Sequence, residues 1–269
     1  MPELPDLEAI REYLNSHIRG QRIVAATVRK AIVLRMPPVA EFIATLTGRV
    51  VGETRRRGKF LLVDIPPDHT LAINPMLTGR VQHCPARERV RASTCLMLAL
   101  ADGSHLRYYD DKVMGKVYLV RSDALATIPR FDEMAPDALD PSVTLEVFRQ
   151  RLRRHPGMVK NILTNDRFLA GIGNAYADEV LFEAGVHPWR PRPRLADADV
   201  ERLYRAIHTV LEDAKAVVAE RMGARIDEKV RDFLKVHSKG GQPCPRCGHT
   251  ITQITARQRL TNYCRRCQS

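Results

Sequence analysis

Hydrophobic residues recur at helical spacing near the start of the chain. They lie three or four residues apart with polar residues between them, at Leu7, Ile10, Leu14 and Ile18. This spacing is typical of an amphipathic helix with one buried face. Gly20 is suited to end the helix, because glycine adopts the left-handed conformation common at that position. We therefore expect an N-terminal helix that packs against a core.

Short apolar runs replace the helical pattern after this segment. They are rich in Val, Ile, Leu and Tyr, and their length suits single strands. The runs read RIVAATV, KFLLVDI, TLAINPM, TCLMLALADGSHLRYY and KVYLV. The ADGSH sequence within the fourth run predicts a tight turn between two strands. The pattern predicts an antiparallel β domain that reaches to about residue 122.

Helical patterns return from Pro141 onward. PSVTLEVFRQRLRRH predicts a helix with Ser142 as its N-cap, and further helices are expected in GMVKNILTND and GNAYADEVLFEAG. The proline-rich stretch over 188–194 cannot continue a helix and predicts a connection. A long helix is expected over 197–222. Its predicted buried stripe consists of Val200, Leu203, Ile207, Leu211, Ala214 and Val218.

The chain is strongly basic. Its 269 residues include 43 Lys and Arg against 31 Asp and Glu, which gives a net charge of +12 and a pI near 9.7. This balance favours an acidic partner, and nucleic acid is the leading candidate. No apolar run approaches the roughly 18 residues of a membrane span, and no signal sequence opens the chain. We therefore expect a cytoplasmic protein without a membrane partner.

Four cysteines form two C-x2-C pairs near the C-terminus. The pairs are Cys244 with Cys247 and Cys264 with Cys267, and 16 residues separate them. Two thiolate pairs at this spacing predict one structural Zn2+ ion in a closed tetrahedral site. A redox pair or unrelated thiols is the alternative.

The TITQITARQRLTNY segment between the cysteine pairs predicts a β-hairpin. Arg257, Gln258 and Arg259 would lie at its tip. A metal can hold such a short segment rigid, and a basic tip is then suited to contact phosphate or a groove. A solvated loop is the alternative.

The first residues, MPELPD, place a proline and a carboxylate directly after Met1. Pro2 can be structural, because the first turn of a helix tolerates its missing N–H. The alternative is chemical: once Met1 is removed, the Pro2 nitrogen becomes a secondary amine that can attack a carbonyl carbon and form an iminium. An α-amino group titrates near about 7.7–8.0, so a useful fraction is unprotonated at neutral pH. Glu3 would be its acid–base partner.

Two lysines and a glycine turn complete the set of candidates. Lys59 begins an apolar strand after three arginines and can project toward a phosphate; a solvated lysine at a strand end is the alternative. Gly171 and Gly173 precede a helix, where they can present N–H groups to an anion or form a tight turn between helices. Lys160 precedes this turn by about one helix and could join it.

These pieces occur together in one family. The PELPDLE start, the RRGKFLL strand, AGIGNAYADEVLFEAGVHP and the finger with QRLTNYCRRCQ resemble the bacterial formamidopyrimidine-DNA glycosylase and endonuclease VIII (Fpg/Nei) family. The resemblance implies an α+β multidomain fold: a β-sandwich with an attached helix over 1–122, a helical domain with a helix-two-turn-helix over 123–236, and a β-hairpin zinc finger over 237–269. It also implies a monomer at the bacterial nucleoid that binds damaged DNA and flips the damaged base out of the stack.

The resemblance also assigns roles to matching residues. Pro2 would be the nucleophile at C1′ of the damaged nucleotide, and Glu3 would assist opening of the sugar ring and proton transfer. Base excision would be followed by strand cleavage through β- and δ-elimination, the activity of a bifunctional DNA glycosylase/AP lyase in base-excision repair. Four residues would grip phosphates around the lesion, with Lys59 beside the reacting groups: Lys59, Lys160, Asn174 and Arg259. Tyr176 would support that surface by packing.

Two loops that fill the void left by the flipped base depart from the family pattern. Where Fpg members carry PRRFG, this chain has DKVMG over 111–115, so Met114 replaces an aromatic wedge. Lys112 could partly replace an arginine that contacts the orphaned base, although it lacks the planar fork of a guanidinium. Leu77, in NPMLTGR, stands at the other void-filling position, which is usually Met. Asn74 stands where Fpg members carry a histidine.

The segment between the long helix and the finger is shorter than in Fpg enzymes. Residues 223–241 lack a counterpart of the loop that closes over 8-oxoguanine in those enzymes. We therefore favour ring-opened purines, oxidised pyrimidines or abasic sites as substrates. The rival hypothesis is a non-catalytic zinc-finger protein that binds damaged or abasic DNA. Binding alone does not require an N-terminal amine, so the joint presence of five residues speaks against this rival: Pro2, Glu3, Lys59, Asn174 and Arg259.

Overall fold

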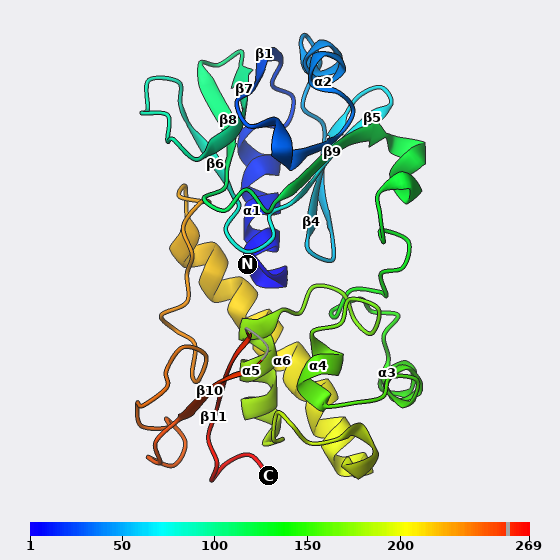
Figure 1. The fold of residues 1–269 in the computed structure, drawn as a ribbon, viewed down its shortest axis with the longest axis vertical. Helices are drawn as coiled ribbons and strands as arrows, with labels where there is room; N and C mark the ends of the chain where they lie inside the picture. The colour runs from blue at the N-terminus through cyan, green and yellow to red at the C-terminus, as the bar shows by residue number, and fades with distance from the viewer. Residues whose placement is uncertain (257–258) are drawn as a thin grey trace. The chain divides into compact units, whose positions relative to one another are not determined.

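The computed structural model describes residues 1–256 and 259–269 of the chain (Figure 1). Its residue contacts divide it into two compact units. The first unit comprises Met1–Asp132 and Val217–Val230, and the second comprises Glu133–Ala216 and Arg231–Ser269. None of the described helices is both long and apolar enough to cross a membrane.

Two β-sheets form most of the first unit. One sheet has the order β1-β7-β8-β6, and the other has the order β2-β9-β5-β4-β3. β2 runs parallel to β9, whereas the other neighbours are antiparallel. The first sheet contains β1 (Ile23–Val28), β6 (Arg80–Pro85), β7 (Thr94–Leu100) and β8 (Ser104–Tyr109). The second contains β2 (Leu34–Met36), β3 (Thr54–Arg57), β4 (Phe60–Ile65), β5 (His69–Asn74) and β9 (Lys116–Arg121).

The strands confirm the β domain expected from the apolar runs. The ADGSH turn joins β7 to β8, and the pairing of Leu98 with Leu106 sets their register. Strands β4, β5 and β9 each have four successive buried residues, so both faces of these strands are covered. Three short helical segments complete the unit: α2 (Val39–Leu46), and the 3-10 helices η1 (Ala31–Val33) and η2 (Ser122–Thr127).

Helix α1 (Leu4–His17) packs against β3 and β4. The predicted apolar face is confirmed, because its four residues are at most 3% exposed: Leu7, Ile10, Leu14 and Ile18. The expected stop at Gly20 is wrong in detail, since the helix ends at His17. Gly20 instead takes a φ of +85° in the turn toward β1, where its N–H donates to the Val51 carbonyl at 2.7 Å.

The second unit is mainly helical. It contains α3 (Leu145–Arg153), α4 (Val159–Leu163), α5 (Asn174–Ala184), η3 (Arg192–Arg194) and most of α6 (Asp197–Met222). A hairpin of β10 (Thr252–Ala256) and β11 (Arg259–Tyr263) lies near the C-terminus. Arg257 and Gln258 of the expected hairpin tip lie outside the described residues.

The ends of these helices follow the local chemistry of the chain. The predicted bounds and buried stripe of α6 are confirmed. The predicted N-cap of α3 at Ser142 is wrong: Thr144 is the N-cap, and its hydroxyl accepts the Val147 N–H at 3.3 Å. Ser142 is instead part of a turn in which its N–H donates to the Asp140 carboxylate at 2.9 Å. An aspartate two residues earlier offers Ser142 this turn in place of a capping role.

Candidate active site and metal centre

The N-terminal cap of α1 fixes the candidate catalytic residues. Glu3 is the N-cap residue, and a capping box joins it to Asp6. The Glu3 carboxylate accepts the Asp6 backbone N–H, and the Asp6 carboxylate accepts the Glu3 N–H at 2.8 Å. Both residues are buried, at 3% and 4% exposed. They occupy backbone donors that the first turn of a helix otherwise leaves unpaired, so the residue that follows Pro2 is held rigidly.

Pro2 lines a small pocket within the first unit. Groups of both charges surround it: Asp6 of α1, Arg80 of β6, Glu228 and Lys229. The last two belong to the segment Val217–Val230. Sequence reasoning did not place Arg80 or this segment beside Pro2, because both are far from Pro2 in the chain.

Asp227 anchors this segment to the β-sheet. Its carboxylate is 8% exposed and accepts the Arg91 guanidinium at 2.9 Å and the Tyr109 hydroxyl at 3.1 Å. Burial and the neighbouring carboxylate raise the pKa of Tyr109 to about 12. Tyr109 therefore stays a donor over the neutral pH range, and the segment beside Pro2 keeps its position.

Lys59 lies at the tip of the β3–β4 hairpin and is 6% exposed. Arg56 holds this tip: its Nε donates to Glu8 of α1 at 2.7 Å, and its Nη1 donates to the Gly58 carbonyl at 2.9 Å. Burial raises the pKa of Glu8, but Arg56 and Arg11 outweigh burial and leave that pKa below its usual value. Glu8 is therefore ionised at neutral pH, and its ion pair with Arg56 ties the β3–β4 hairpin to α1.

The other predicted residues of the first unit lie on two loops. Leu77 is in the β5–β6 loop and is 49% exposed. Met114 is in the β8–β9 loop and is 38% exposed, and Lys112 of the same loop is exposed. These side chains are therefore available to a partner.

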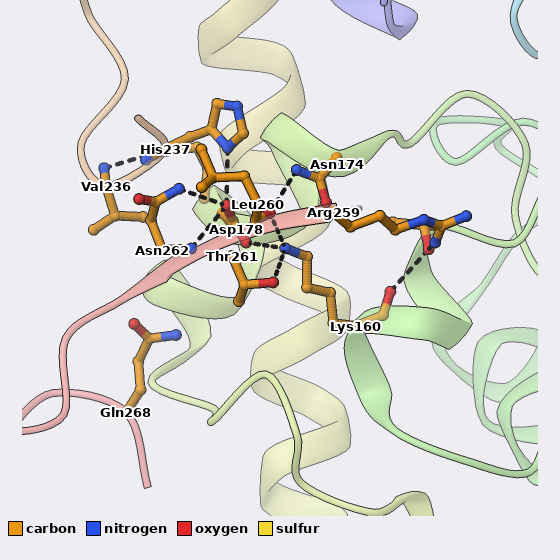
Figure 2. Close-up of polar contacts among 12 residues, drawn as sticks. Lys160, Asn174, Asp178, Val236, His237, Arg259, Leu260, Thr261, Asn262 and Gln268 are labelled. Atoms are coloured by element: carbon orange, nitrogen blue, oxygen red, sulfur yellow. Dashed lines mark hydrogen bonds and ion pairs between the residues drawn. The ribbon is translucent and has the colours of Figure 1, made fainter. Parts of the chain in front are cut away.

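Lys160, Asn174 and Arg259 converge around strand β11 in the second unit (Figure 2). Lys160 Nζ from α4 and Asn174 Nδ2 from α5 both donate to the Leu260 carbonyl, at 2.9 and 2.7 Å. Arg259 is exposed, and its Nη1 donates to Thr164 Oγ1 at 3.2 Å. The structure thus brings together three predicted residues that are distant in the sequence.

The ammonium group of Lys160 is buried and engaged. Lys160 is 5% exposed and forms an ion pair with Asp178 at 2.6 Å. Its Nζ also donates to Thr261 Oγ1 at 2.7 Å and to the Leu260 carbonyl. An ammonium has three N–H donors, and these contacts direct it at β11 and at Asp178. Lys160 therefore fixes β11 against the helices.

Asp178 is the centre of this network, as Figure 2 shows. It is fully buried, and its Oδ2 accepts His237 Nδ1 at 2.8 Å and the Asn262 backbone N–H at 3.2 Å. The next residue, Glu179, accepts three successive backbone N–H groups over 235–237 at 2.8–2.9 Å. Burial raises the pKa of Glu179, although these N–H groups act in the opposite direction. Sequence reasoning missed both acids, although two adjacent acids within the apolar NAYADEVLFEA helix are a usable signal.

The four cysteines of the finger form one cluster. Their Sγ atoms all lie within 4.8 Å of one another, with separations of 3.9 Å for Cys244 and Cys267 and 3.5 Å for Cys247 and Cys264. Tetrahedral zinc at the usual Zn–S distance needs sulfur atoms about 3.8 Å apart, so the cluster fits one Zn2+ ion. The His249 backbone N–H helps to lower the pKa of the Cys247 thiol to about 7. This favours the thiolate form of Cys247 that zinc requires, whereas burial raises the pKa of the Cys264 and Cys267 thiols, so zinc must displace their protons.

The finger shares a small core with α5. Five buried residues form this core: Phe182, Val236, Cys244, Ile251 and Cys264. In addition, Gln268 Nε2 donates to the Val186 carbonyl beyond the end of α5 at 3.0 Å. The metal therefore stabilises packing against α5 as well as the finger itself.

Three family models match successive parts of the chain. They are the formamidopyrimidine-DNA glycosylase N-terminal domain over 1–117, its H2TH domain over 134–226, and the zinc finger found in FPG and IleRS over 241–269. The second match includes α4 and α5, which are joined by turns and contain Lys160 and Asn174. The third match contains the four-cysteine cluster, so the predicted zinc site is confirmed as a structural one.

Curated relatives and solved structures agree with this assignment. Formamidopyrimidine-DNA glycosylases of Pelotomaculum thermopropionicum and Heliobacterium modesticaldum are 32% and 36% identical to the chain, with at least 99% of each protein covered. A Lactococcus lactis Fpg structure with abasic-site DNA covers 99% of both chains with a TM-score of 0.90 and 26% identity. A mutant of that protein with Fapy-dG DNA gives a TM-score of 0.89 and 25% identity, with both chains covered in full.

These findings define a three-part DNA-repair architecture of N-terminal domain, helix-two-turn-helix and zinc finger. The chain belongs to the formamidopyrimidine-DNA glycosylase family. The resemblance and the fold class predicted from the sequence are therefore confirmed.

Proposed function

We propose that this protein is a bifunctional glycosylase and AP lyase that removes damaged bases from DNA through the Pro2 amine. The observation that carries this proposal is the rigid capping box around Glu3, directly after Pro2, in a chain of this family. A structural role alone would require a cap but not a proline that becomes the terminal residue once Met1 is removed. Removal of Met1 is a requirement of the mechanism, because a peptide-bonded Pro2 nitrogen has no nucleophilic lone pair.

The chemistry begins with attack of the Pro2 nitrogen on C1′ of the damaged nucleotide. The bond from C1′ to the base breaks, and the base leaves with the electron pair and takes up a proton. Glu3 accepts the proton that the Pro2 nitrogen loses and passes it to the sugar ring oxygen as the ring opens. The product is an iminium that links Pro2 to C1′.

Strand cleavage follows from the positive charge of this iminium. The charge acidifies the C2′ proton, so loss of this proton expels the 3′ phosphate in β-elimination. A second elimination expels the 5′ phosphate. Lys59 would stabilise phosphate charge near the reacting groups. The ion pair of Arg56 with Glu8, which holds the hairpin tip against α1, supports this role.

Contacts to the DNA backbone would come from Arg259, the exposed first residue of β11, and from the loops of the first unit. Arg259 would bind phosphate directly, whereas Lys160 and Asn174 would fix the strand that carries it, since both donate to the Leu260 carbonyl. Leu77 and Met114 would fill the void left by the flipped base, with Lys112 beside the orphaned partner. The zinc ion stabilises the finger and takes no part in the chemistry.

The substrate class is a ring-opened purine, an oxidised pyrimidine or an abasic site. The relatives include Lactococcus lactis structures with Fapy-dG and abasic-site DNA, which supports this range. The short segment over 223–241 disfavours 8-oxoguanine. We propose that the protein acts as a monomer, because the residues assigned to chemistry and binding all lie on one chain.

The test is borohydride trapping on DNA with an abasic site. Borohydride reduces the iminium, so the processed protein should form a stable protein–DNA adduct, and intact mass should first show that Met1 is absent. A variant with one extra residue that stays bonded to the Pro2 nitrogen is the matched control: it should bind the DNA and form no adduct. Glu3→Gln keeps an oxygen for the cap and should slow adduct formation. If the processed wild-type protein binds abasic DNA without forming an adduct, the rival of a non-catalytic binder is correct.

A further inference from the structure

Two loops of the first unit each expose one large apolar side chain. Leu77 is 49% exposed and Met114 is 38% exposed. Single exposed apolar side chains are common, so the case for a function rests on how rigidly the backbone around these two residues is held. The contacts behind these two residues show such rigidity.

The Asp110 carboxylate joins the two loops. It is fully buried, and Oδ1 accepts the Thr78 hydroxyl from the β5–β6 loop and the Lys112 N–H from the β8–β9 loop, the latter at 3.2 Å. Oδ2 accepts the Gly115 N–H at 2.7 Å and the Tyr108 hydroxyl at 3.3 Å. One carboxylate thus accepts hydrogen bonds from both loops.

The donors that Asp110 binds are adjacent to the exposed residues. Thr78 directly follows Leu77, and Gly115 directly follows Met114. The Lys112 N–H also approaches Thr78 Oγ1 at 3.3 Å, which adds a direct link between the loops. A shift of either apolar side chain therefore strains contacts on the other loop.

The backbone of both loops is held in conformations that need support. Met76 has a φ of +51° and Val113 a φ of +47°, which are unfavourable for residues with a side chain. The Asn74 side chain accepts the Met76 N–H at 3.1 Å, and the Asp110 carbonyl accepts the Val113 N–H at 3.3 Å. Such conformations persist only where surrounding contacts determine them.

The two loops also meet at a single side chain, Tyr108. A Cβ atom added to Gly79 would lie 2.1 Å from the Tyr108 hydroxyl, and one added to Gly115 would lie 1.7 Å from it. Neither position has room for a side chain. Tyr108 and Asp110 together therefore form a common support for both loops.

We propose that Asp110 is a positioning residue that makes Leu77 and Met114 enter DNA as one unit. The inference rests on the proposed function, because it concerns the filling of the void after base flipping. Two wedges on independent loops would contribute separately to flipping. Wedges that share one buried carboxylate contribute together, and each depends on the position of the other.

The test is a double-mutant cycle on excision of a damaged base from duplex DNA. In the wild-type background, Leu77→Ala and Met114→Ala should be strongly non-additive in kcat/KM, with a departure of about tenfold from the product of the single effects. In a Thr78→Val background the same pair should become additive to within about twofold. Thr78→Val removes the hydroxyl that links the loops but keeps the volume of the side chain, so the fold should survive. Asp110→Asn should likewise make the effects of Leu77→Ala and Met114→Ala on kcat/KM more nearly additive.

Two further measurements separate positioning from general damage. Thr78→Val should slow excision of a paired base about tenfold but change borohydride trapping on abasic DNA less than about twofold, because an abasic site has no base to unstack. Asp102→Asn is the matched control, since Asp102 holds the β7–β8 turn through the Ser104 N–H at 2.8 Å and should change neither rate. Additive wedge effects in the wild-type background would overturn the inference. So would equal losses of excision and trapping in Thr78→Val. Absence of trapping in the wild-type protein would instead overturn the proposed function.

Discussion

The buried ion pair of Lys160 with Asp178 gives the sharpest test of how the second unit is held together. Asp178→Asn removes the negative charge but keeps nearly the same volume. Lys160, at 5% exposed, then loses its counter-ion in a buried site. The new amide NH2 also faces donors of Lys160, His237 or Asn262, because an amide presents one acceptor where the carboxylate presented two.

The magnitude follows from the burial of both partners. Removing one member of a buried pair costs about 3–5 kcal/mol, a large share of the roughly 5–15 kcal/mol that stabilises a typical domain. For a unit of this size we expect the Tm to fall by about 10–20 °C. Differential scanning calorimetry of the zinc-loaded protein measures this change. Glu212→Gln is the control: its carboxylate pairs with Lys215 at 2.8 Å on the surface of α6, and its loss should cost less than about 1 kcal/mol.

A double variant tests the reasoning behind this number. Lys160→Met with Asp178→Leu removes both charges, and apolar replacement of a complete buried pair is often neutral. The double variant should therefore be more stable than Asp178→Asn alone. A loss below about 1 kcal/mol for Asp178→Asn, or a double variant that is less stable than the single one, would refute the role assigned to the pair.

Three more changes test the finger, the phosphate contact and the hairpin of Lys59. Cys264→Ser should release zinc and disorder the finger while the β domain stays folded, as metal analysis and circular dichroism can show; loss of all structure would contradict this. Arg259→Ala should weaken DNA binding and lower the slope of log K against log salt by about 0.9, and an unchanged slope would exclude a phosphate contact. For Glu8, whose folded pKa lies below 4.5, the ion pair with Arg56 stabilises the fold above that pH and is lost as the pH falls through the folded value. The stability advantage of wild type over Glu8→Gln should therefore be full at pH 6 and shrink below pH 4.5, which urea unfolding at several pH values measures.

Local sequence patterns predicted the elements that depend mainly on residues close together in the chain. The stripe of α6 and the face of α1 follow from the period of a helix, and the zinc cluster follows from the spacing of its thiolates. Helix ends were less predictable because neighbouring caps compete. Thr144 caps α3 in place of Ser142, since Asp140 draws Ser142 into a turn.

The contacts that support the site depend on residues far apart in the chain. Lys160 was expected to face phosphate, but no sequence pattern shows that Asp178 and Thr261 surround its ammonium group. Asp110 likewise resembles an ordinary turn residue until the fold brings Thr78 to it. Identification of the family assigned roles to particular residues; the geometry shows which of them are exposed, such as Arg259, and which are buried among other residues, such as Lys160.

The left-handed residues of the two wedge loops have a consequence for engineering this protein. Glycine adopts a positive φ without steric strain, so Met76→Gly and Val113→Gly would relieve local strain, against an entropic cost of about 0.4–1 kcal/mol from the more flexible unfolded chain. Selection for heat tolerance enriches changes that remove strain, often at the expense of activity. A library screened only for thermal survival would therefore favour glycine in these loops and give the wedges more freedom. The most heat-stable variants of such a library should therefore be the first to be assayed for slower base excision.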